Sequence, residues 1–330
     1  MTMKRRDFIT LLGGAAAAWP LTARAQQPTL PAIGVLGSGS RETFEFALAA
    51  FAQGLRQQGY VEDRNLSIRY SWADGHYGLL PSMAAEFVRR RMAVIVTFGG
   101  TVTAQAAKAA TSTIPIVFAI GTDPVAMGLV ASLNRPGGNL TGATSLTVEL
   151  APKRLELLHD LLPRVTRIGF LTNPESGAAL QAAINEDRAA AARLGIEVQD
   201  LPVARDADFD LAFERLVQAG LGALDVSTDP FHLSRRERIV ALAMRHRIPT
   251  IYSGSEYARA GGLMSYGSSG AALYVVAGDY AGRILKGEKP ADLPVQEAPK
   301  VELIINMKTA KAIGLEIPPT VLARADEVIE

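Results

Sequence analysis

The chain has 330 residues, 48% of them hydrophobic, with 34 basic and 33 acidic side chains. This near-balance, without a long charged run, argues against a surface for nucleic acid or anionic lipid. The absence of cysteine excludes disulfides and a lipid anchor on an N-terminal cysteine. The four histidines do not share metal-ligand spacing, so we expect no metal site.

Residues 1–25 have the composition of an export signal. Basic residues at 4–6 precede an apolar run over 8–19, and "ARA" at 23–25 is a small-x-small cleavage site before Gln26. The run is too short for a permanent membrane anchor, which needs about 20 residues. The paired arginines favour a twin-arginine signal over a general secretory one. We therefore predict a cleaved signal and a periplasmic protein. The signal holds four basic and one acidic side chain, which leaves 30 and 32, a net charge of −2.

From residue 31 the chain alternates short β-rich runs with amphipathic segments. The first half predicts strands at 32–36, 66–72, 93–98, 114–120 and 139–145, and helices at 42–58, 77–91, 101–111 and 124–133. The alternation restarts with strands at 167–172, 196–203, 222–227, 248–253 and 261–267, and helices at 177–194, 207–219 and 231–247. The tail predicts a helix at 271–286, a strand at 301–307, and short helices at 308–313 and 320–328.

This pattern predicts an α/β protein with two lobes of similar topology. Near-continuous apolar strands that alternate with helices are typical of parallel sheets covered on both faces. The elements after residue 270 do not fit two separate lobes. We therefore expect the chain to cross back between the lobes, which would form a hinge beneath a cleft.

Three predicted strand ends carry the same tripeptide, Thr followed by Asp or Asn and then Pro, centred on Asp123, Asn173 and Asp229. Helix capping explains each, because Asp or Asn accepts hydrogen bonds from free helix amides and Pro suits the first helical position. Ligands of open parallel sheets bind beyond the carboxyl ends of the strands. These three side chains are therefore also candidate ligand contacts, and the aspartates would suit an amine or hydroxyls.

Other predicted strand ends carry glycine, hydroxyl and aromatic residues. Glycines let a ligand approach the backbone, and free amides at a helix N-terminus bind anions such as carboxylates; a plain turn is the alternative. The late aromatic residues are candidates for stacking or apolar contact, with a place in the core as the alternative. The candidates at these positions are Ser38, Gly99, Gly100, Thr101, Tyr252, Ser253 and Tyr266.

Catalytic and cofactor motifs are incomplete. The loop after the first strand has Gly37 and Gly39 of a dinucleotide fingerprint, but Glu42 stands in place of the third glycine. No G-x-S-x-G elbow occurs, and the spaced glycines Gly282 and Gly287 lack the lysine and hydroxyl of a P-loop. His76 and His159 have no evident nucleophile partner. We expect neither an enzyme nor a cofactor.

Four stretches carry a resemblance to a known family. They are "DPVAMGLVASLNRPGGNLTG" (123–142), "AGGLMSYG" (260–267), "GRILKGEKPADLPVQ" (282–296) and the stretch that begins "VELIINM" (301–330). They resemble bacterial ABC-transporter substrate-binding proteins, including tryptophan/tyrosine uptake proteins. The resemblance runs from about Pro31 to the C-terminus.

The resemblance implies the type 1 periplasmic binding-protein (Venus flytrap) fold, in which two Rossmann-like lobes joined by crossovers trap a ligand. It implies a first lobe of 31–145 plus about 268–298, and a second of 146–267 plus about 299–330. The helix at 271–286 would return to the first lobe and the strand at 301–306 to the second. By similarity the pocket positions include Ser38, Thr101, Asp123, Asn173, Asp229 and Tyr252.

The chain departs from its relatives near the cleft. Relatives commonly carry charged residues after the "SYG" motif, where this chain has an uncharged stretch at 268–276. Relatives often show Arg-Glu-Phe before "AGGLMSYG", where this chain has Ser-Glu-Tyr at 255–257. The lower charge of this rim suits a less charged or more apolar solute.

The expected function is therefore the extracytoplasmic solute-binding part of an ABC importer. The protein would capture a small organic solute, an amino acid or carboxylate with aromatic ones included, by hinge closure. As a monomer, it would deliver the solute to an inner-membrane permease and its ATPase. One alternative is an exported ligand-sensing module for a receptor kinase, which would use the same fold. An exported hydrolase is the other, although no catalytic constellation is visible.

Overall fold

The buried strands of the first half follow from runs of β-branched and apolar residues that leave no polar face. In the computed structural model, which describes residues 30–268, 270–298 and 300–330, β3 (Val94–Phe98) and β4 (Ile116–Ile120) are buried along their whole length. Such strands require cover on both faces, which is typical of parallel sheets. The predicted export signal lies outside the described residues.

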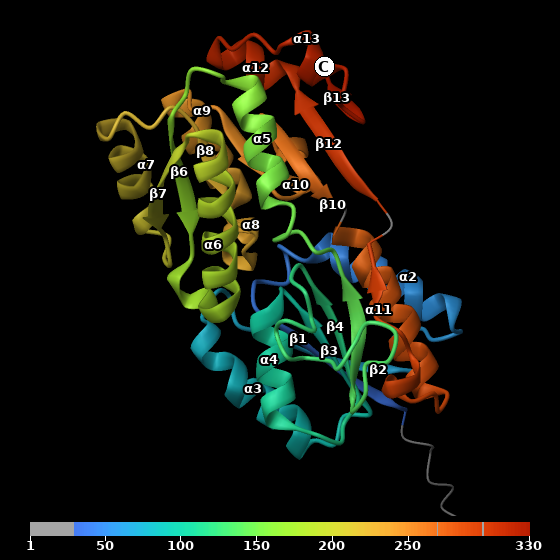
Figure 1. The fold of residues 1–330 in the computed structure, drawn as a ribbon. Helices are drawn as coiled ribbons and strands as arrows, with labels where there is room; N and C mark the ends of the chain where they lie inside the picture. Colours follow the sequence, from blue (N-terminus) through green and yellow to red (C-terminus); the bar gives the residue numbers. More distant parts are fainter. Residues whose placement is uncertain (1–29, 269, 299) are drawn as a thin grey trace, which may run out of the picture. The chain divides into compact units, whose positions relative to one another are not determined.

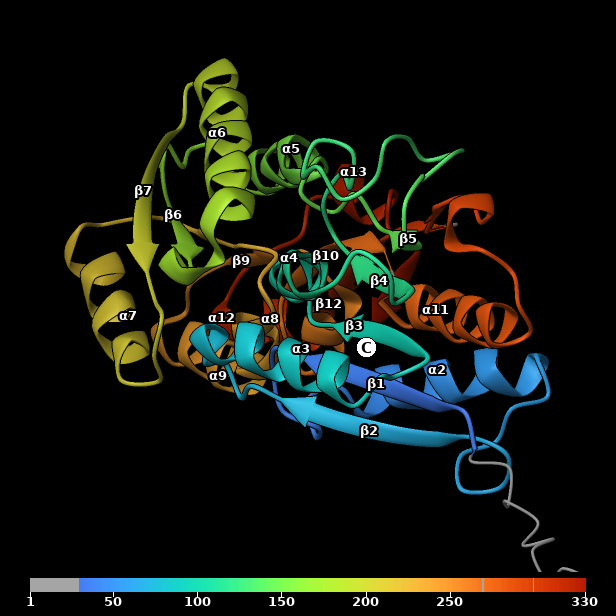
Figure 2. The same cartoon turned by 90° about the horizontal axis from the view of Figure 1, so that it is seen from below.

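The first lobe is a six-stranded parallel sheet in the order β11-β5-β4-β3-β1-β2. Helices α3 and α4 pack on one face, and α2 and α11 on the other (Figures 1 and 2). The elements not yet bounded are β1 (Ala32–Gly37), α2 (Glu45–Gln57), β2 (Ser67–Trp72), the 3₁₀ turn η1 (Tyr77–Leu79), α3 (Leu80–Arg89), α4 (Thr101–Ala110), β5 (Leu140–Thr144), α11 (Gly270–Leu285), η3 (Pro290–Asp292) and β11 (Gln296–Glu297).

The second lobe repeats this arrangement in a seven-stranded sheet, β13-β12-β10-β9-β8-β6-β7. Helices α7 and α9 cover one face, and α5, α6, α12 and α13 the other. Its elements are α5 (Ala151–Leu161), β6 (Arg167–Thr172), η2 (Pro174–Ser176), α6 (Gly177–Leu194), β7 (Glu197–Pro202), α7 (Asp208–Gln218), β8 (Leu224–Val226), α8 (Pro230–Ser234), α9 (Arg236–His246), β9 (Thr250–Tyr252), α10 (Ser255–Arg259), β10 (Met264–Ser268), β12 (Val301–Asn306), α12 (Met307–Ile313), α13 (Pro319–Leu322) and β13 (Glu327–Ile329).

The strand order explains where a site would form. In both sheets the chain begins near one side of the sheet, pairs its second strand outward and then reverses direction, as in doubly wound folds. The reversal lies between β1 and β3 in the first lobe, and between β6 and β8 in the second. Ligands of such sheets bind in the crevice outside the carboxyl ends at this point.

Helix α11 lies against α2 although more than 200 residues separate them in the sequence (Figure 1). Two glycines allow the close approach. A Cβ at Gly54 would overlap the Val275 carbonyl oxygen, and a Cβ at Gly278 would overlap the Phe51 carbonyl oxygen. The helix that follows the second lobe in sequence therefore packs on the first.

The structure corrects several predicted elements. The segment 124–133 is a series of turns rather than a helix, and Gly128 within it has φ of 65°. The helix predicted at 231–247 is broken at Arg235, whose guanidinium pairs with Asp206 and lies over the Phe231 ring. The helix predicted at 320–328 ends early, and residues 327–329 form the edge strand β13.

Other elements were not predicted. They are the helices α5 and α10 and the short edge strand β11. Strand β12 runs antiparallel to β10, so the second sheet is mixed rather than wholly parallel.

Candidate functional site

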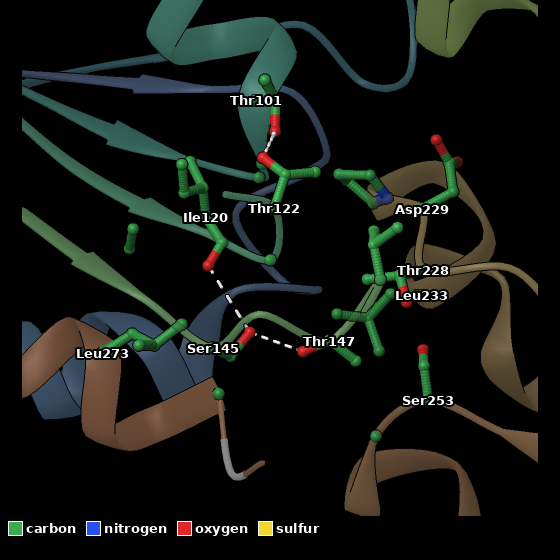
Figure 3. A pocket seen from close by; sticks show the side chains of 18 of the residues that line it. Thr101, Ile120, Thr122, Ser145, Thr147, Thr228, Asp229, Leu233, Ser253 and Leu273 are labelled. Atoms are coloured by element: carbon green, nitrogen blue, oxygen red, sulfur yellow. Dashed lines mark hydrogen bonds between the residues drawn. The ribbon is translucent and has the colours of Figure 1, made fainter. Parts of the chain in front are cut away.

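A pocket of about 160 Å³ lies at the carboxyl ends of both sheets. The loops after β3 and β4 of the first lobe line it, together with the loops after β8 and β9 of the second. In Figure 3, Thr101 and Thr122 lie on one side of the pocket, and Thr228, Asp229 and Ser253 on the other. The segment that follows β5 toward the second lobe adds Ser145 and Thr147.

Five of the ten residues predicted from the sequence line this pocket. They come from three strand ends: Gly99, Gly100 and Thr101 after β3, Asp229 after β8, and Ser253 after β9. The structure thus brings residues from both halves of the sequence into one cavity. Whether each contacts a ligand stays a prediction.

The loop after β3 lines the pocket and leads into the N-terminus of α4. Gly99 and Gly100 have φ of 86° and 84°, a region that L-residues with side chains rarely adopt. Helix α4 begins at Thr101, and its N-cap residue Gly100 has no side chain to satisfy the first amides. A helix N-terminus of this kind favours an anion, such as a carboxylate.

Asp229 is held by an unusually full set of donors. It is the N-cap of α8, and its Oδ1 accepts from the backbone N–H of Phe231 at 2.9 Å and of His232 at 3.2 Å. Asn173 Nδ2 donates to the same oxygen at 3.1 Å, and Ser176 Oγ donates to Oδ2. The predicted capping role is confirmed for Asp229, and it is confirmed for Asn173, whose side chain caps η2.

A tyrosine from the first lobe reaches this carboxylate. Tyr77 Oη lies 3.4 Å from both oxygens of Asp229, and the Phe231 N–H donates to Tyr77 Oη at 3.1 Å. Burial and the Asp229 charge raise the pKa of Tyr77 well above its usual range. Its hydroxyl therefore stays protonated and links the two lobes.

The other five predicted residues are not among those that line the pocket, and most support residues that do. Ser38 Oγ donates to the Gly99 carbonyl at 2.8 Å, and Asn173 holds Asp229. The Tyr252 ring is fully buried and stacks on Tyr257 with centroids 4.6 Å apart. The last two are Asp123, which caps the turn at Val125 and Ala126, and Tyr266, which is half-buried beside the core of the second lobe.

The pocket has an aromatic wall whose residues the sequence did not mark as ligand contacts, although two of them lie in the stretches at 255–257 and 268–276 that differ from relatives. Phe44 and Phe46, at the start of α2, pack edge-to-face on Tyr274 of α11 with centroids 6.3 and 6.2 Å apart. Tyr257 of α10 also lines the pocket. These residues lie in or directly before helices rather than at the strand ends where ligand contacts were expected.

Three hydroxyl groups in the pocket have no hydrogen-bond partner among the described residues. They are Thr228 Oγ1, Tyr257 Oη and Ser268 Oγ, and each is buried. A buried hydroxyl without a partner costs about 1–3 kcal/mol. A bound polar ligand would offset that cost, so these atoms mark where one would bind.

The buried histidine near the pocket, His232, is held by other protein groups. Both ring nitrogens of the fully buried His232 are in contact, Nδ1 with Ser227 Oγ and Nε2 with the Val203 carbonyl, each at 3.2 Å. Burial lowers the pKa of His232. Within the described residues, no cluster of three or more His, Asp or Glu side chains is placed to hold a metal ion. None of the described helices has the length and apolar character needed to span a membrane.

Comparison with known proteins identifies the family. The model of the family described as ABC transporter substrate binding protein matches residues 33–329. A tyrosine-binding protein of Clostridioides difficile is 30% identical over 286 residues, which cover 86% of this chain and 81% of that protein.

Two solved structures are similar in both sequence and fold. A conserved domain protein from Vibrio cholerae is 31% identical with a TM-score of 0.80, covering 90% of this chain and 99% of that one. A Streptococcus pneumoniae ABC domain in complex with L-Trp is 28% identical, also with a TM-score of 0.80, covering 91% and 100%. These matches confirm the predicted two-lobed periplasmic binding fold, and the chain belongs to the ABC transporter substrate-binding protein family.

Proposed function

We propose that this protein captures a small organic solute outside the cytoplasm and delivers it to the permease of an ABC importer. Members of the family bind small molecules extracytoplasmically and work with a permease. The observation that carries the proposal is the pocket, which loops of both lobes line at the carboxyl ends of their sheets. The family assignment favours transport over the sensing alternative.

The proposed solute class is an amino acid or carboxylate, with aromatic side chains favoured. The free amides at the N-terminus of α4 suit a carboxylate, and the carboxylates of Asp229 and Glu256 give the pocket a negative charge that favours an amine. Phe46 and Tyr274 suit a ring, because aromatic pairs contribute about 0.5–1.5 kcal/mol beyond area burial. The relatives described as tyrosine-binding and as bound to L-Trp support this class.

The proposed mechanism is closure of the lobes over the solute, without a chemical step. Tyr77 of the first lobe and Asp229 of the second make a contact that requires the lobes to be close. A ligand that contacts both lobes stabilises the closed state by its differential affinity for that state. We propose that the protein acts as a monomer, and that residues 1–25 direct its export and are removed before Gln26.

The proposed lobe limits and site follow the sequence analysis. Strands β1–β5 and β11 share one sheet, and the other described strands share the second. This supports a first lobe of 31–145 plus about 268–298 and a second of 146–267 plus about 299–330. The proposed ligand-binding residues are Ser38, Gly99, Gly100, Thr101, Asp123, Asn173, Asp229, Tyr252, Ser253 and Tyr266, to which the pocket adds Phe46, Glu256, Tyr257 and Tyr274.

A thermal-shift screen of the purified protein tests the proposal. The panel holds amino acids, aromatic acids, short organic acids, sugars and vitamins. A ligand at a hundredfold excess over its Kd stabilises the folded state by about 2.7 kcal/mol. A hit that is recovered unchanged supports solute binding, whereas a compound recovered chemically altered would overturn the proposal in favour of an enzyme.

A further inference from the structure

The charged side chains that line the pocket are both acidic. Among the lining residues, all in the described part of the chain, Asp229 and Glu256 carry carboxylates and none is lysine, arginine or histidine. Most of the remaining wall is apolar or carries hydroxyl groups. Such a cavity favours a ligand group with a positive charge.

Asp229 is not free to receive that group. Two backbone amides of α8, Asn173, Ser176 and Tyr77 already surround its two oxygens. A carboxylate offers about four lone-pair sites, so these donors occupy its capacity. Asp229 therefore organises the loops of the pocket, and Glu256 is the acid available to a ligand.

Glu256 lies where the two lobes meet. A Cβ built on Gly254 would lie 2.6 Å from Glu256 Oε2, and one built on Gly270 would lie 3.2 Å from Oε1. Gly254 follows β9 of the second lobe, and Gly270 begins α11 of the first. The carboxylate thus rests against the backbone of two glycines that both line the pocket.

The charge of Glu256 is only partly compensated by the protein. Burial raises its pKa, and the opposing influences are the backbone N–H groups of Glu256 and Gly270 and the guanidinium groups of Arg259 and Arg236. Neither arginine lines the pocket, and Arg259 is exposed and pairs with Glu327. A cation in the cavity would supply the missing compensation.

Two unpartnered hydroxyls belong to residues that line the same pocket as this carboxylate. Tyr257, which follows Glu256 in α10, is 2% exposed, and Ser268 at the end of β10 is 6% exposed. The hydroxyl oxygen of each lacks a hydrogen-bond partner among the described residues and belongs to a pocket-lining side chain. Burial is the main cause that raises the pKa of Tyr257, and the negative charges of Asp229 and Glu256 raise it further.

We propose that Glu256 binds a protonated amine of the solute, with Tyr257 Oη and Ser268 Oγ completing the subsite. The carboxylate neutralises the ammonium charge, and three oxygen atoms match the three N–H donors of a primary ammonium group. The inference rests on the proposed solute-binding function and narrows its substrate class. The solute is a primary amine with an apolar or aromatic body, whether or not it also carries a carboxylate.

Isothermal titration of the purified protein tests the subsite with four probes. L-Tyrosine and L-tryptophan carry both charges, tyramine carries only the amine, and 3-(4-hydroxyphenyl)propanoate carries only the carboxylate. We expect the amine-bearing probes to bind and the propanoate to bind at least tenfold more weakly. Glu256→Gln should weaken the amines by about 10- to 100-fold, which corresponds to one charge-assisted hydrogen bond, and leave the weak propanoate binding unchanged.

A matched control separates this effect from a general loss of structure. Glu197→Gln makes the same change at an exposed glutamate that begins β7, at the end of the strand opposite the pocket, and that pairs with Arg167. Its amine affinities should equal those of the wild type. Circular dichroism melting of both variants checks that they are folded.

The outcomes separate the subsite from the function. Propanoate binding as tight as that of tyrosine, or unchanged amine affinity in Glu256→Gln, overturns the ammonium subsite and leaves solute binding intact. If the only compound that binds in the thermal-shift screen lacks an amine, the ammonium subsite is likewise overturned and solute binding stands. No shift with any compound in that screen overturns both proposals.

Discussion

Replacement of Arg154 by methionine should destabilise the protein strongly, because it leaves buried acids without their cation. Arg154 in α5 is 2% exposed, and its Nε lies 3.6 Å from Oδ1 of the fully buried Asp225 in β8. Its Nη1 donates to the Thr147 carbonyl at 2.8 Å, and Thr147 lines the pocket. Asp187 of α6, also buried, is near enough for the Asp225 charge to raise its pKa, after burial as the main cause.

The magnitude follows from the burial of the pair. Removal of one partner of a buried ion pair costs about 3–5 kcal/mol, since the remaining charge loses its compensation. In a chain of this size a loss of 1 kcal/mol lowers the Tm by about 2 °C, so the Tm should fall by about 6–10 °C. Arg324→Met is the matched control, because Arg324 makes an exposed pair with Asp160 at 2.6 Å. That loss should stay below about 1 kcal/mol.

The stability loss of Arg154→Met should depend on pH in a definite direction. Burial raises the pKa of Asp225 to about 6 despite Arg154, and without Arg154 this pKa should rise further. A carboxyl group with a raised folded-state pKa binds its proton more tightly in the folded protein, so stability falls as the pH rises through that range. The Arg154→Met loss should therefore be larger at pH 7.5 than at pH 5.

Urea denaturation at the two pH values measures both effects. The double variant Arg154→Met with Asp225→Asn should recover much of the loss at pH 7.5, because it removes the stranded charge as well. The reasoning is refuted if Arg154→Met costs no more than Arg324→Met, or costs the same at both pH values.

Three further predictions concern the pocket. Tyr77→Phe removes the hydroxyl that links the lobes through a long contact, 3.4 Å, with the Asp229 carboxylate, so titration should find solute affinity weakened about 2- to 12-fold, a loss of about 0.5–1.5 kcal/mol. Tyr70→Phe removes a hydroxyl that donates to Glu62 within one lobe and should leave the affinity unchanged. Phe46→Ala should weaken an aromatic solute by a similar factor but not an aliphatic one, and equal losses for both would argue against ring contact. Amine affinity should fall as the pH is lowered, because the pKa of Glu256 is raised and protonation removes its charge. The affinity of Glu256→Gln for amines should not depend on pH in this way. If it does, the pH dependence belongs to another group.

The residues at the strand ends could be predicted as site candidates, because in parallel α/β folds the ligand binds at the carboxyl ends of the strands. Hydrophobic runs and capping signals located β3, β6 and the cap at Asp229, and a parallel sheet then places their carboxyl ends on one edge. Periodicity does not distinguish a helix from a set of turns when a glycine needs positive φ, as at Gly128. Periodicity also cannot indicate that the Asp229 carboxylate will face five hydrogen-bond donors.

The aromatic and acidic parts of the site depend on contacts between distant segments. Tyr274 reaches the pocket because α11 packs on α2 through Gly54 and Gly278, a contact that no local pattern encodes. Glu256 was noticed only as part of a stretch that differs from relatives. Its importance follows from its partial burial in the pocket and from its place beside Gly270, which are properties of the folded chain.

The interleaving of the two lobes makes each dependent on the end of the chain. The first sheet receives its edge strand β11 and its helix α11 only after the whole of residues 146–268 has passed through the second lobe. The second sheet in turn is completed by β12 and β13. During synthesis the first lobe lacks its edge strand until residue 297 is made, and the second lobe lacks β12 and β13 until the last thirty residues are made. A chain stopped at residue 290 would therefore lack the strands that cover β5 in the first sheet and β10 in the second. Neither lobe corresponds to one continuous segment of the gene, so a single cut cannot separate them.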